Sequence, residues 1–587
     1  MPNSFPTIQC PTGQKAHYRL GHWWNPFSDE WVGECVLTEK PRPSTQSSFA
    51  MISEKDLCAH PVTVGKPGGV LHLVNRMPLM TLGPGLLRSN GDTEQINSLL
   101  LYEPLFRLDP CTQQWTPQLA ESYSWSEDHK QLTLKLRPNL HWSDGAPLTA
   151  DDLVFSLKML TDTTSAVRGA EQWRDGSGAP PTVQKLDDTT VVLTTKILKL
   201  NLLDLLNAHR VLPAHRLQAI YDKDPQKIEE GFRDETLVTS GPFRFVQRDE
   251  SHLILERNPF YWKKDSAGQS LPYFDKIEMQ RLQTETSAQQ YLMAGAVDVY
   301  TSREINPDHY QSKGLSKVSE IYYLADVGVA QIYYFLVFNL RSGKNLPNYF
   351  FDPRFRRAVS LALNRSDYHL LQRGVVPLLG FYPPSNDLWY RKLLSEEAQV
   401  DQAKKLMQEL GLQDGSAKFS IKYRADDVIR SRVSKTIRQD LQKIGVEVDV
   451  RPTEFATLLE DMGKGNFETF FSAAFMDGTD TVTPISEDIL PSFGDSHYWN
   501  PSQKKPATLW EAEIDRLWGD LLQAPEESKR VALFGQISQT LAEQMPIVPL
   551  LSLEHYGFYK KDLKNVRPSP TNVELYSNVE EWYRSEP

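Results

Sequence analysis

The chain has 587 residues, enough for about three or four domains at the usual domain size. Hydrophobic residues make up 40% and charged residues 24%, which is an ordinary globular composition with ample apolar side chains for a core. The net charge is −11, from 64 Lys and Arg against 75 Asp and Glu. This balance argues against a nucleic-acid-binding surface, because such a surface needs clustered positive charge.

The first fifteen residues carry neither the basic start nor the apolar stretch of a signal peptide. No apolar run reaches the roughly 18 residues that a membrane-spanning helix needs. Cys10 follows Gln9 without an apolar segment before it, so we do not expect it to carry a lipid anchor. Two locations stay open: the cytoplasm, or an extracytoplasmic, membrane-associated location for a chain whose signal is absent from this sequence.

Residues 1–65 are rich in Pro, Ser and Trp and show no sustained strand or helix period. They are predicted to form an N-terminal extension held by contacts or disulfides, not a separate folded domain. "KPGG" at 66–69 marks its end, and "VLHLV" after it predicts a first strand. The even number of cysteines leaves disulfides possible in three pairings, and free thiols are an equal alternative: Cys10, Cys35, Cys58 and Cys111.

A block with its own strands follows at 101–238. Leu132, Leu134 and Leu136 alternate with polar residues, which predicts a half-buried strand, and 189–196 predicts another.

Within this block, "LHWSDGAPLTADDLVFSL" (140–157) gathers three carboxylates, which raises acid–base or metal chemistry. The structural interpretation is favoured. Asp144 opens a turn, Thr149 caps a helix, and Asp151 and Asp152 lie in its first turn, where the helix dipole favours negative charge. We expect Thr149→Ala to cost more stability than Asp152→Ala, which loses only a reciprocal capping bond.

Helices and strands alternate after residue 351. Asp352 predicts a helix cap with Pro353 at the first helical position. A strand at 418–423, a helix with one apolar stripe, and a strand at 446–450 together predict a βαβ unit, and hence a partly parallel sheet. The apolar stripe consists of Val433, Ile437, Leu441 and Ile444.

A series of motifs in chain order resembles the family 5 extracellular solute-binding proteins, which include the oligopeptide-, dipeptide- and nickel-binding receptors of ABC importers. "TPQLAESYSWSEDHKQLTLKLRPNLHWSDGAPLTADDLVFSL" (116–157) is similar to a signature of that family. Further similar stretches are 99–110, 240–245, 255–262, 271–279, 294–300, 337–365, 403–411 and 546–551. Any one motif is weak, but their order is specific, and the resemblance covers roughly 66–587.

The resemblance implies an α/β fold of the type II periplasmic-binding class: two lobes with mixed sheets, a two-strand hinge and an extra inserted domain. The hinge is expected near Tyr334–Asn339 and Pro546–Leu551. The ligand is expected between the lobes. The predicted boundaries are 1–65 for the extension, 66–100, 239–333 and 547–587 for lobe I, 101–238 for the inserted domain, and 334–546 for lobe II.

Candidate ligand contacts follow from the resemblance. Asp477 falls on the aspartate that holds the α-amino group in peptide-binding members. However, Met476 replaces the usual Ala and Gly478 the usual Tyr, so the alternative is that Asp477 only begins a turn. The backbone of 473–476 is expected to pair with an extended peptide by strand addition, which gives affinity without reading side chains. The residues of this segment are Ala473, Ala474, Phe475 and Met476.

Three further side chains are candidates for the walls of the cleft: Tyr382, Trp389 and His497. The competing interpretation for Tyr382 and Trp389 is packing of a Pro-rich loop. No metal-ligand pair, phosphate-binding loop or serine-hydrolase motif occurs, so no metal, cofactor or catalytic residue is expected.

The leading functional hypothesis is a monomeric, non-enzymatic receptor. It would capture an oligopeptide-like or other small solute outside the cytoplasm and deliver it to the membrane permease of an ABC importer. An oligosaccharide receptor of the same family is one alternative, since 13 Trp are ample for stacking on sugars. A glycoside hydrolase with paired carboxylates is another, although no pair demands it. A cytoplasmic sensor would need a DNA-binding element, and no helix–turn–helix pattern is present. Nucleic acid is therefore not an expected partner.

Overall fold

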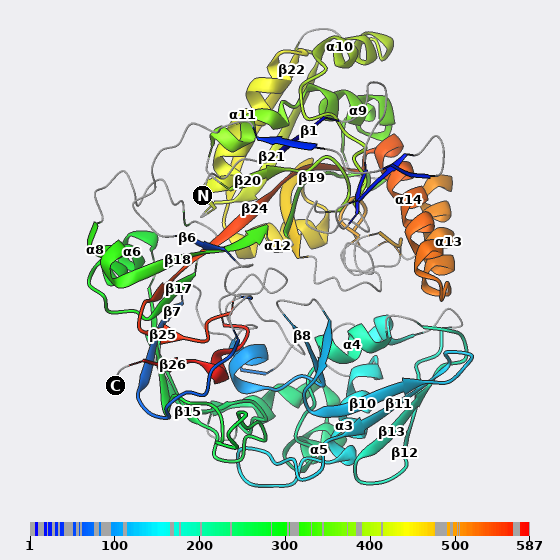
Figure 1. Cartoon of the computed structure of the whole chain (residues 1–587). Coiled ribbons are helices and arrows are strands. Elements are labelled where there is room, and N and C mark those ends of the chain that lie inside the picture. Colours follow the sequence, from blue (N-terminus) through cyan, green and yellow to red (C-terminus); the bar gives the residue numbers. More distant parts are fainter. Residues whose placement is uncertain are drawn as a thin grey trace.

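The structure is a computed structural model. It describes residues 6–9, 17–19, 22–25, 30–32, 36–39, 51–53, 58, 61–75, 82–83, 96–109, 114–164, 170–174, 178–199, 202–234, 237–282, 284–301, 305, 316–329, 332–342, 345–371, 374–382, 390–412, 415–425, 427–475, 490–492, 497–501, 503, 505–567 and 576–585. Figure 1 shows lobe II at the top, lobe I at the lower left and the inserted domain at the lower right.

Lobe I is built on one side of a large mixed sheet. Its strands run in the order β14 (Phe243–Arg248), β15 (His252–Arg257), β16 (Lys276–Arg281), β7 (Val70–Asn75), β17 (Val299–Thr301) and β24 (Ile547–Lys560). Strands β16 and β17 both run parallel to β7. Around them lie η1 (Ile96–Leu101), α6 (Glu285–Met293), α8 (Ser316–Ile321), β18 (Tyr322–Val329), β25 (Leu563–Lys564), η7 (Val579–Glu581) and β26 (Tyr583–Arg584).

The inserted domain has its own antiparallel sheet and its own core. The sheet order is β10 (Ala120–Trp125), β11 (Gln131–Leu136), β13 (Thr190–Thr194) and β12 (Thr182–Lys185), so both strands predicted in this block are confirmed. The core includes Trp142 and Trp173, both fully buried. The remaining elements are β8 (Phe106–Leu108), β9 (Trp115–Pro117), α3 (Ala150–Thr161), η2 (Ala170–Trp173), α4 (Leu202–Ala208), α5 (Ala214–Lys223) and η3 (Pro225–Phe232).

Lobe II contains the predicted βαβ unit. β21 (Ala417–Arg424), α11 (Val428–Gln442) and β22 (Val446–Thr453) follow in order, and the two strands pair in parallel. Asp352 caps α9 (Pro353–Ala362), as predicted, by accepting a hydrogen bond from the Arg354 backbone. The other elements are β19 (Ile332–Phe338), η5 (Asn348–Phe351), η6 (Arg365–Leu370), β20 (Val375–Pro377), α10 (Val400–Glu409), α12 (Phe455–Lys464), β23 (Thr469–Phe475), α13 (Leu509–Leu522) and α14 (Glu527–Gln544).

Strand β24 joins the two lobes. Its first half pairs with β19 and β20 of lobe II, and its second half pairs with β18 and β17 of lobe I. Figure 1 shows it as one long strand running obliquely from one lobe to the other. The change of partners falls between Leu553 and Glu554, and Ile547 to Leu553 contribute to the lobe II core. The boundary predicted at 546/547 stays a prediction; the first half of β24, which follows it, pairs with strands of lobe II.

The buried clusters otherwise group along the predicted segments. Lobe II residues from Tyr333 to Leu553 form one cluster, inserted-domain residues from Leu105 to Val238 form a second, and three smaller clusters lie in lobe I. We propose that these clusters correspond to the three folding units that the sequence predicts.

Part of the N-terminal extension joins the lobe I sheet. β6 (Met51–Ser53) pairs in parallel with β18. This pairing is a contact of the kind expected to hold the extension. Five shorter strands form a pair and a meander: β1 (Pro6–Gln9), β2 (His17–Arg19), β3 (His22–Asn25), β4 (Glu30–Val32) and β5 (Val36–Glu39). Cys58 is disulfide-bonded. The other three cysteines, Cys10, Cys35 and Cys111, lie outside the described residues.

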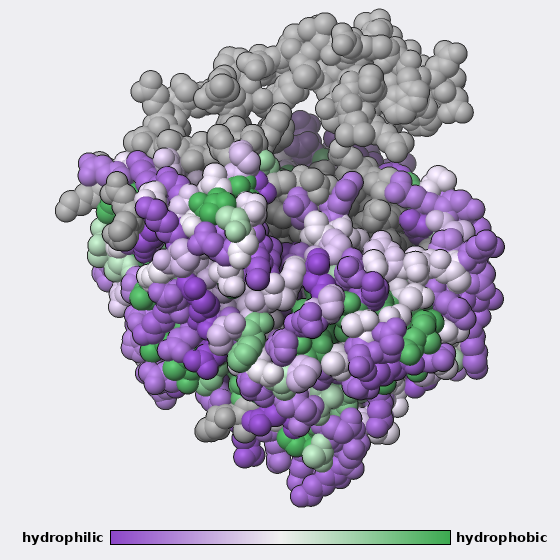
Figure 2. Space-filling view, turned by 60° about the horizontal axis from the view of Figure 1, so that its bottom comes forward, coloured by the Kyte–Doolittle hydropathy of each residue, from purple (hydrophilic) through white to green (hydrophobic). Residues whose placement is uncertain are grey.

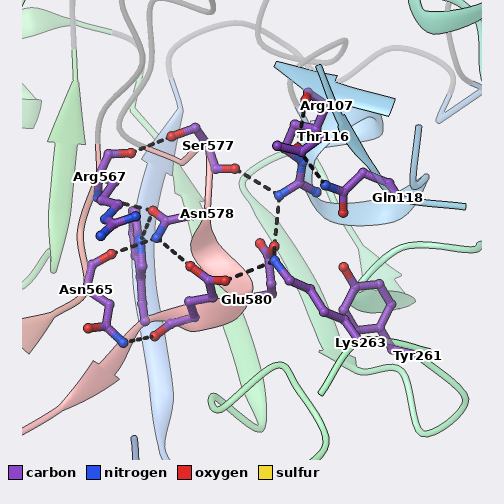
Figure 3. A network of polar contacts seen from close by, with 12 residues as sticks. Arg107, Thr116, Gln118, Tyr261, Lys263, Asn565, Arg567, Ser577, Asn578 and Glu580 are labelled. Atoms are coloured by element: carbon purple, nitrogen blue, oxygen red, sulfur yellow. Dashed lines mark hydrogen bonds and ion pairs between the residues drawn. The ribbon is translucent and has the colours of Figure 1, made fainter. Parts of the chain in front are cut away.

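A buried ion network ties the inserted domain to lobe I and to the C-terminal segment. Glu580 is fully buried and accepts hydrogen bonds from Arg107 Nη1 at 2.8 Å and from Lys263 Nζ at 2.7 Å. Glu103, also buried, accepts from Arg107 Nη2 at 3.2 Å and from the Tyr261 hydroxyl at 2.9 Å. Figure 3 shows Arg107 and Lys263 converging on Glu580 from different parts of the chain. Because buried charges are costly unless paired, this network fixes how the three segments meet.

The face formed by lobe I and the inserted domain is mainly hydrophilic. Figure 2 turns this face toward the reader, and its apolar residues lie in small, separated patches. Among the described helices, none is both long enough and apolar enough to cross a membrane.

The carboxylates of the 140–157 stretch are held in structural roles. Asp144 accepts from the Ala146 backbone at 3.1 Å and lies 2.9 Å from His215 Nε2. Asp151 pairs with Lys185 at 2.8 Å. Thr149 caps α3, and Asp152 completes the capping box, as predicted. No group of three or more His, Cys, Asp or Glu suited to a metal ion occurs among the residues that the structure describes.

The relative cost of the two capping substitutions is expected to be the reverse of the sequence-based order. Asp152 is 4% exposed and accepts from the Ala214 backbone at 2.8 Å as well as from the Thr149 backbone at 2.9 Å. Asp152→Ala should therefore cost about 2–3 kcal/mol, since it leaves buried donors unsatisfied. Thr149→Ala should cost about 0.5–2 kcal/mol. Urea denaturation of both variants measures the order, and a smaller loss for Asp152→Ala would contradict it.

Candidate functional site

The carboxyl ends of the parallel strands in the two lobes face one another across the hinge. In lobe I, Val299 of β17 pairs with Tyr559 of β24, and Thr301 pairs with Gly557, so β17 runs toward lobe II. β7 and β16 run the same way. In lobe II, Phe475 at the end of β23 pairs with Ile332, the residue of β19 nearest lobe I. Ligands in open α/β sheets bind at the carboxyl ends of the strands.

On lobe II the described part of this edge carries exposed apolar side chains and an arginine. Phe455 and Leu459 lie one turn apart on α12, directly after β22, and are 36% and 50% exposed. The guanidinium of Arg424, the last residue of β21, lies 4.8 Å from the centre of the Phe455 ring. Val428 at the start of α11 is 44% exposed. Exposed apolar side chains grouped at a strand edge commonly mark a binding surface.

Strand β23 offers backbone groups beside this surface. It pairs with β19 along its whole length, from Phe338–Thr469 to Ile332–Phe475. On its other side, its pairing with β21 covers only Thr469 to Phe471 among the described residues. Ala473 and Ala474 are partly exposed, and their small side chains allow another chain to approach closely. This arrangement suits an extended ligand that adds as a strand.

Two of the residues predicted to wall the cleft are buried. Tyr382 is 2% exposed and packs edge-to-face on Phe534 of α14, with ring centroids 5.8 Å apart. His497 is fully buried, with its ring 4.2 Å from that of Trp499. Their described contacts are those of core residues, which for Tyr382 agrees with the packing interpretation.

The His497 ring is held by a buried carboxylate. His497 Nε2 lies 3.6 Å from Glu511 Oε1, and the Trp499 indole donates to the same oxygen at 3.0 Å. Burial alone would raise the pKa of Glu511, but the nearby His497 ring and the hydrogen bond from the Trp499 indole hold it below its ordinary value. This is a satisfied polar group within the lobe II core.

The remaining predicted contacts are not placed. Trp389, Met476, Asp477 and the side chain of Phe475 lie outside the described residues. Phe455, Leu459 and Arg424 were not predicted from sequence. Phe455 and Leu459 are spaced i and i+4 on a helix that follows a strand. Core-facing residues have the same spacing, so the sequence does not indicate that these two side chains are exposed.

The two lobes, the crossing strand and the opposed carboxyl edges place the chain in the type II periplasmic-binding fold class. The family model for bacterial extracellular solute-binding proteins, family 5 (middle), matches residues 114–488. The chain therefore belongs to the family 5 extracellular solute-binding proteins.

Individual relatives are distant. A probable ABC transporter-binding protein of Deinococcus radiodurans is 25% identical over 533 residues, which cover 82% of this chain and 86% of that protein. The oligopeptide-binding protein AppA of Bacillus subtilis, solved in complex with a nonapeptide, has a TM-score of 0.73 at 22% identity, covering 89% of this chain and 100% of that one. A periplasmic alpha-galactoside-binding protein of Rhizobium meliloti is 31% identical over 208 residues, covering 33% of this chain and 30% of that protein.

Proposed function

We propose that the protein is the extracytoplasmic substrate-binding component of an ABC importer. It binds an oligopeptide-like solute between its lobes as a monomer, without catalysis, and delivers the solute to a membrane permease. The observation that carries the peptide assignment is the outer backbone edge of β23 beside Phe455 and Arg424. Relatives named for oligopeptide binding support the same class. Mass spectrometry of the solute that co-purifies with the protein tests the proposal, and a bound glycan with no peptide would contradict it.

An oligosaccharide is the second candidate solute. The observation in its favour is the likeness to the alpha-galactoside-binding protein. Its sequence identity is the highest among these relatives, but the match covers only 33% of the chain. An exposed aromatic ring such as Phe455 also suits stacking on a sugar face. Competition between a peptide mixture and an α-galactoside for the same protein separates the two candidates.

Phe455→Ala should weaken solute binding by about tenfold, or about 1.4 kcal/mol, because it removes apolar area at the lobe II edge. The test is calorimetric titration of the purified variant with the identified solute. Phe351→Ala is the matched control, since Phe351 is 45% exposed but belongs to η5, whose Tyr349 contacts the amino end of β21. Equal affinity in the two variants would remove Phe455 from the site.

Asp477→Asn should weaken binding of a free-amine peptide by about 1–3 kcal/mol, the scale of a charge-assisted hydrogen bond. An N-acetylated peptide of the same sequence should lose less, because it carries no ammonium group. Titration of both peptides into wild type and variant measures the difference. If the variant loses both equally, or loses neither, Asp477 does not hold the amine.

A further inference from the structure

A cavity lies at the carboxyl edge of the lobe I sheet. It has a volume of about 320 Å³ and is enclosed by the ends of β7 and β16 and by the turn between β14 and β15. Asn75 and Arg281, the last residues of β7 and β16, are register partners, and both line it. Since β7 and β16 run toward lobe II, the strand ends that border this cavity lie at the edge of the lobe I sheet nearest the region where the solute is proposed to bind. A volume near 300 Å³ lies at the lower end of small-molecule sites.

Two arginines line the cavity, and they differ in whether a carboxylate pairs with them. Arg248 donates from Nε to Asp234 at 2.8 Å, so its charge is matched. The Arg281 guanidinium makes one hydrogen bond, from Nη1 to the Glu250 carbonyl at 3.5 Å. Its Nε is buried and has no hydrogen-bond partner, and no carboxylate of the described residues lies within ion-pair distance of it. A guanidinium presents donors in a planar fork that matches a carboxylate, so Arg281 retains open donors for one.

Three acids line the same cavity, Asp234, Asp249 and Glu250, and the first two are engaged by other groups. The Asp249 carboxylate accepts from the backbones of Ser251 at 2.7 Å and His252 at 2.9 Å, and these bonds lower its pKa. Asp234 faces Arg248. The backbone of Arg281 is fixed by donation to the Ser251 carbonyl at 2.7 Å, so the position of its side chain is anchored by the sheet and the hairpin. An anchored guanidinium that lines a cavity and has no carboxylate within ion-pair distance can serve as a preorganised anion site.

We propose that this cavity is a subsite for a carboxylate of the transported solute, with Arg281 as the group that binds it. The inference rests on the proposed function and extends it: the receptor prefers solutes that carry a free carboxylate, such as a peptide C-terminus or an acidic side chain, over their neutral amides. Asn75, at the adjacent strand end, lines the same space.

The test compares Arg281→Gln with wild type in the full chain. Each protein is incubated with an equimolar mixture of synthetic peptides of about two to nine residues, each present with a free C-terminal carboxylate and as its C-terminal amide. Retained peptides are then quantified by mass spectrometry. Arg244→Gln is the matched control, because Arg244 lies on β14, in the hairpin that borders the cavity, but is exposed and paired with Glu256. Thermal unfolding of all three proteins establishes that each is folded.

Wild type and Arg244→Gln should retain free carboxylates over amides by about tenfold, and Arg281→Gln should lose that preference. Retention of the preference in folded Arg281→Gln would overturn the subsite while leaving the proposed function in place. Wild-type protein that retains the free-carboxylate peptides and their amides equally would also overturn the subsite while leaving the proposed function in place. If inorganic phosphate or sulfate raises the unfolding temperature of wild type but not of Arg281→Gln and no carboxylate preference is seen, the cavity takes a free anion and the proposal is overturned. A wild type that retains no peptide overturns the proposed function and the subsite with it.

Discussion

Glu580→Gln should lower the free energy of unfolding by about 3–5 kcal/mol, because it leaves buried cations without their counter-charge. Arg107 and Lys263 both direct their charges at Glu580, at 2.8 and 2.7 Å, and the Arg107 side chain is 11% exposed. Glutamine keeps the shape and one acceptor but carries no charge. Glu103 alone would then balance Arg107, and Lys263 would keep only Glu581, at 3.0 Å.

Chemical denaturation of wild type and variant measures this loss. Glu256→Gln is the control, because Glu256 pairs with Arg244 at 3.1 Å on the surface, where both side chains are more than 40% exposed. Such a surface pair contributes at most about 1 kcal/mol. A loss for Glu580→Gln no larger than that of the control would mean that the network in Figure 3 does not hold the inserted domain to lobe I.

The same carboxylate should give the protein an acid-dependent loss of stability. Burial raises the pKa of Glu580, but the charges of Arg107 and Lys263 outweigh it and lower the pKa to about 2, from an ordinary 4.5. Because the folded pKa is depressed, its contribution is complete above pH 4.5 and falls away as the pH drops from 4.5 toward 2. The difference between wild type and Glu580→Gln should therefore shrink over that range. A difference that stays constant from pH 6 to pH 3 would contradict the assignment.

Elements with their own local signals could be predicted from the sequence. The caps at Thr149 and Asp352 rest on contacts within a few residues, and the elements of the βαβ unit at 417–453 each show their own apolar pattern; the structure confirms all three. The end of lobe II has no such local signal in the sequence. All but two residues of β24 are buried, so the strand shows no alternation of polar and apolar positions and no sign of where its partners change.

The candidate site was harder to predict because it depends on tertiary exposure. His497 and Tyr382 have polar atoms and lie near loop-rich sequence, yet both side chains are buried. Phe455, an ordinary helix-start aromatic in sequence, is exposed because α12 begins at the open edge of the sheet. The lack of a counter-charge at Arg281 depends on the pairing of β7 with β16, which joins residues 70–75 to 276–281. A pattern of neighbouring residues cannot predict a contact between segments about 200 positions apart in the chain.

Arg365→Met should also cost about 3–5 kcal/mol, for a different reason: Arg365 satisfies buried oxygen atoms and does not pair with a carboxylate. It is 1% exposed and donates from Nε to the Pro549 carbonyl at 3.0 Å, from Nη1 to the Ser360 carbonyl at 3.0 Å, and from Nη2 to the Ser360 hydroxyl at 2.9 Å. Burial lowers its pKa, so keeping the guanidinium charged already costs free energy. Removing it recovers that cost but strands the acceptors, each worth about 1–3 kcal/mol when buried and unsatisfied.

Because Pro549 lies on the part of β24 that pairs with lobe II, the damage from Arg365→Met should concentrate there. Hydrogen exchange of the amides in 547–553 should accelerate more than exchange in β10 or β11 of the inserted domain. Arg354→Met, on the exposed face of α9 and paired with Asp352 at 2.7 Å, is the control and should cost less than about 1 kcal/mol. Arg365→Lys should fall between the two, since an ammonium restores charge and donors without the planar fork. Equal losses for Arg365→Met and Arg354→Met would show that these buried carbonyls find other donors, and that β24 is held to lobe II by strand pairing alone.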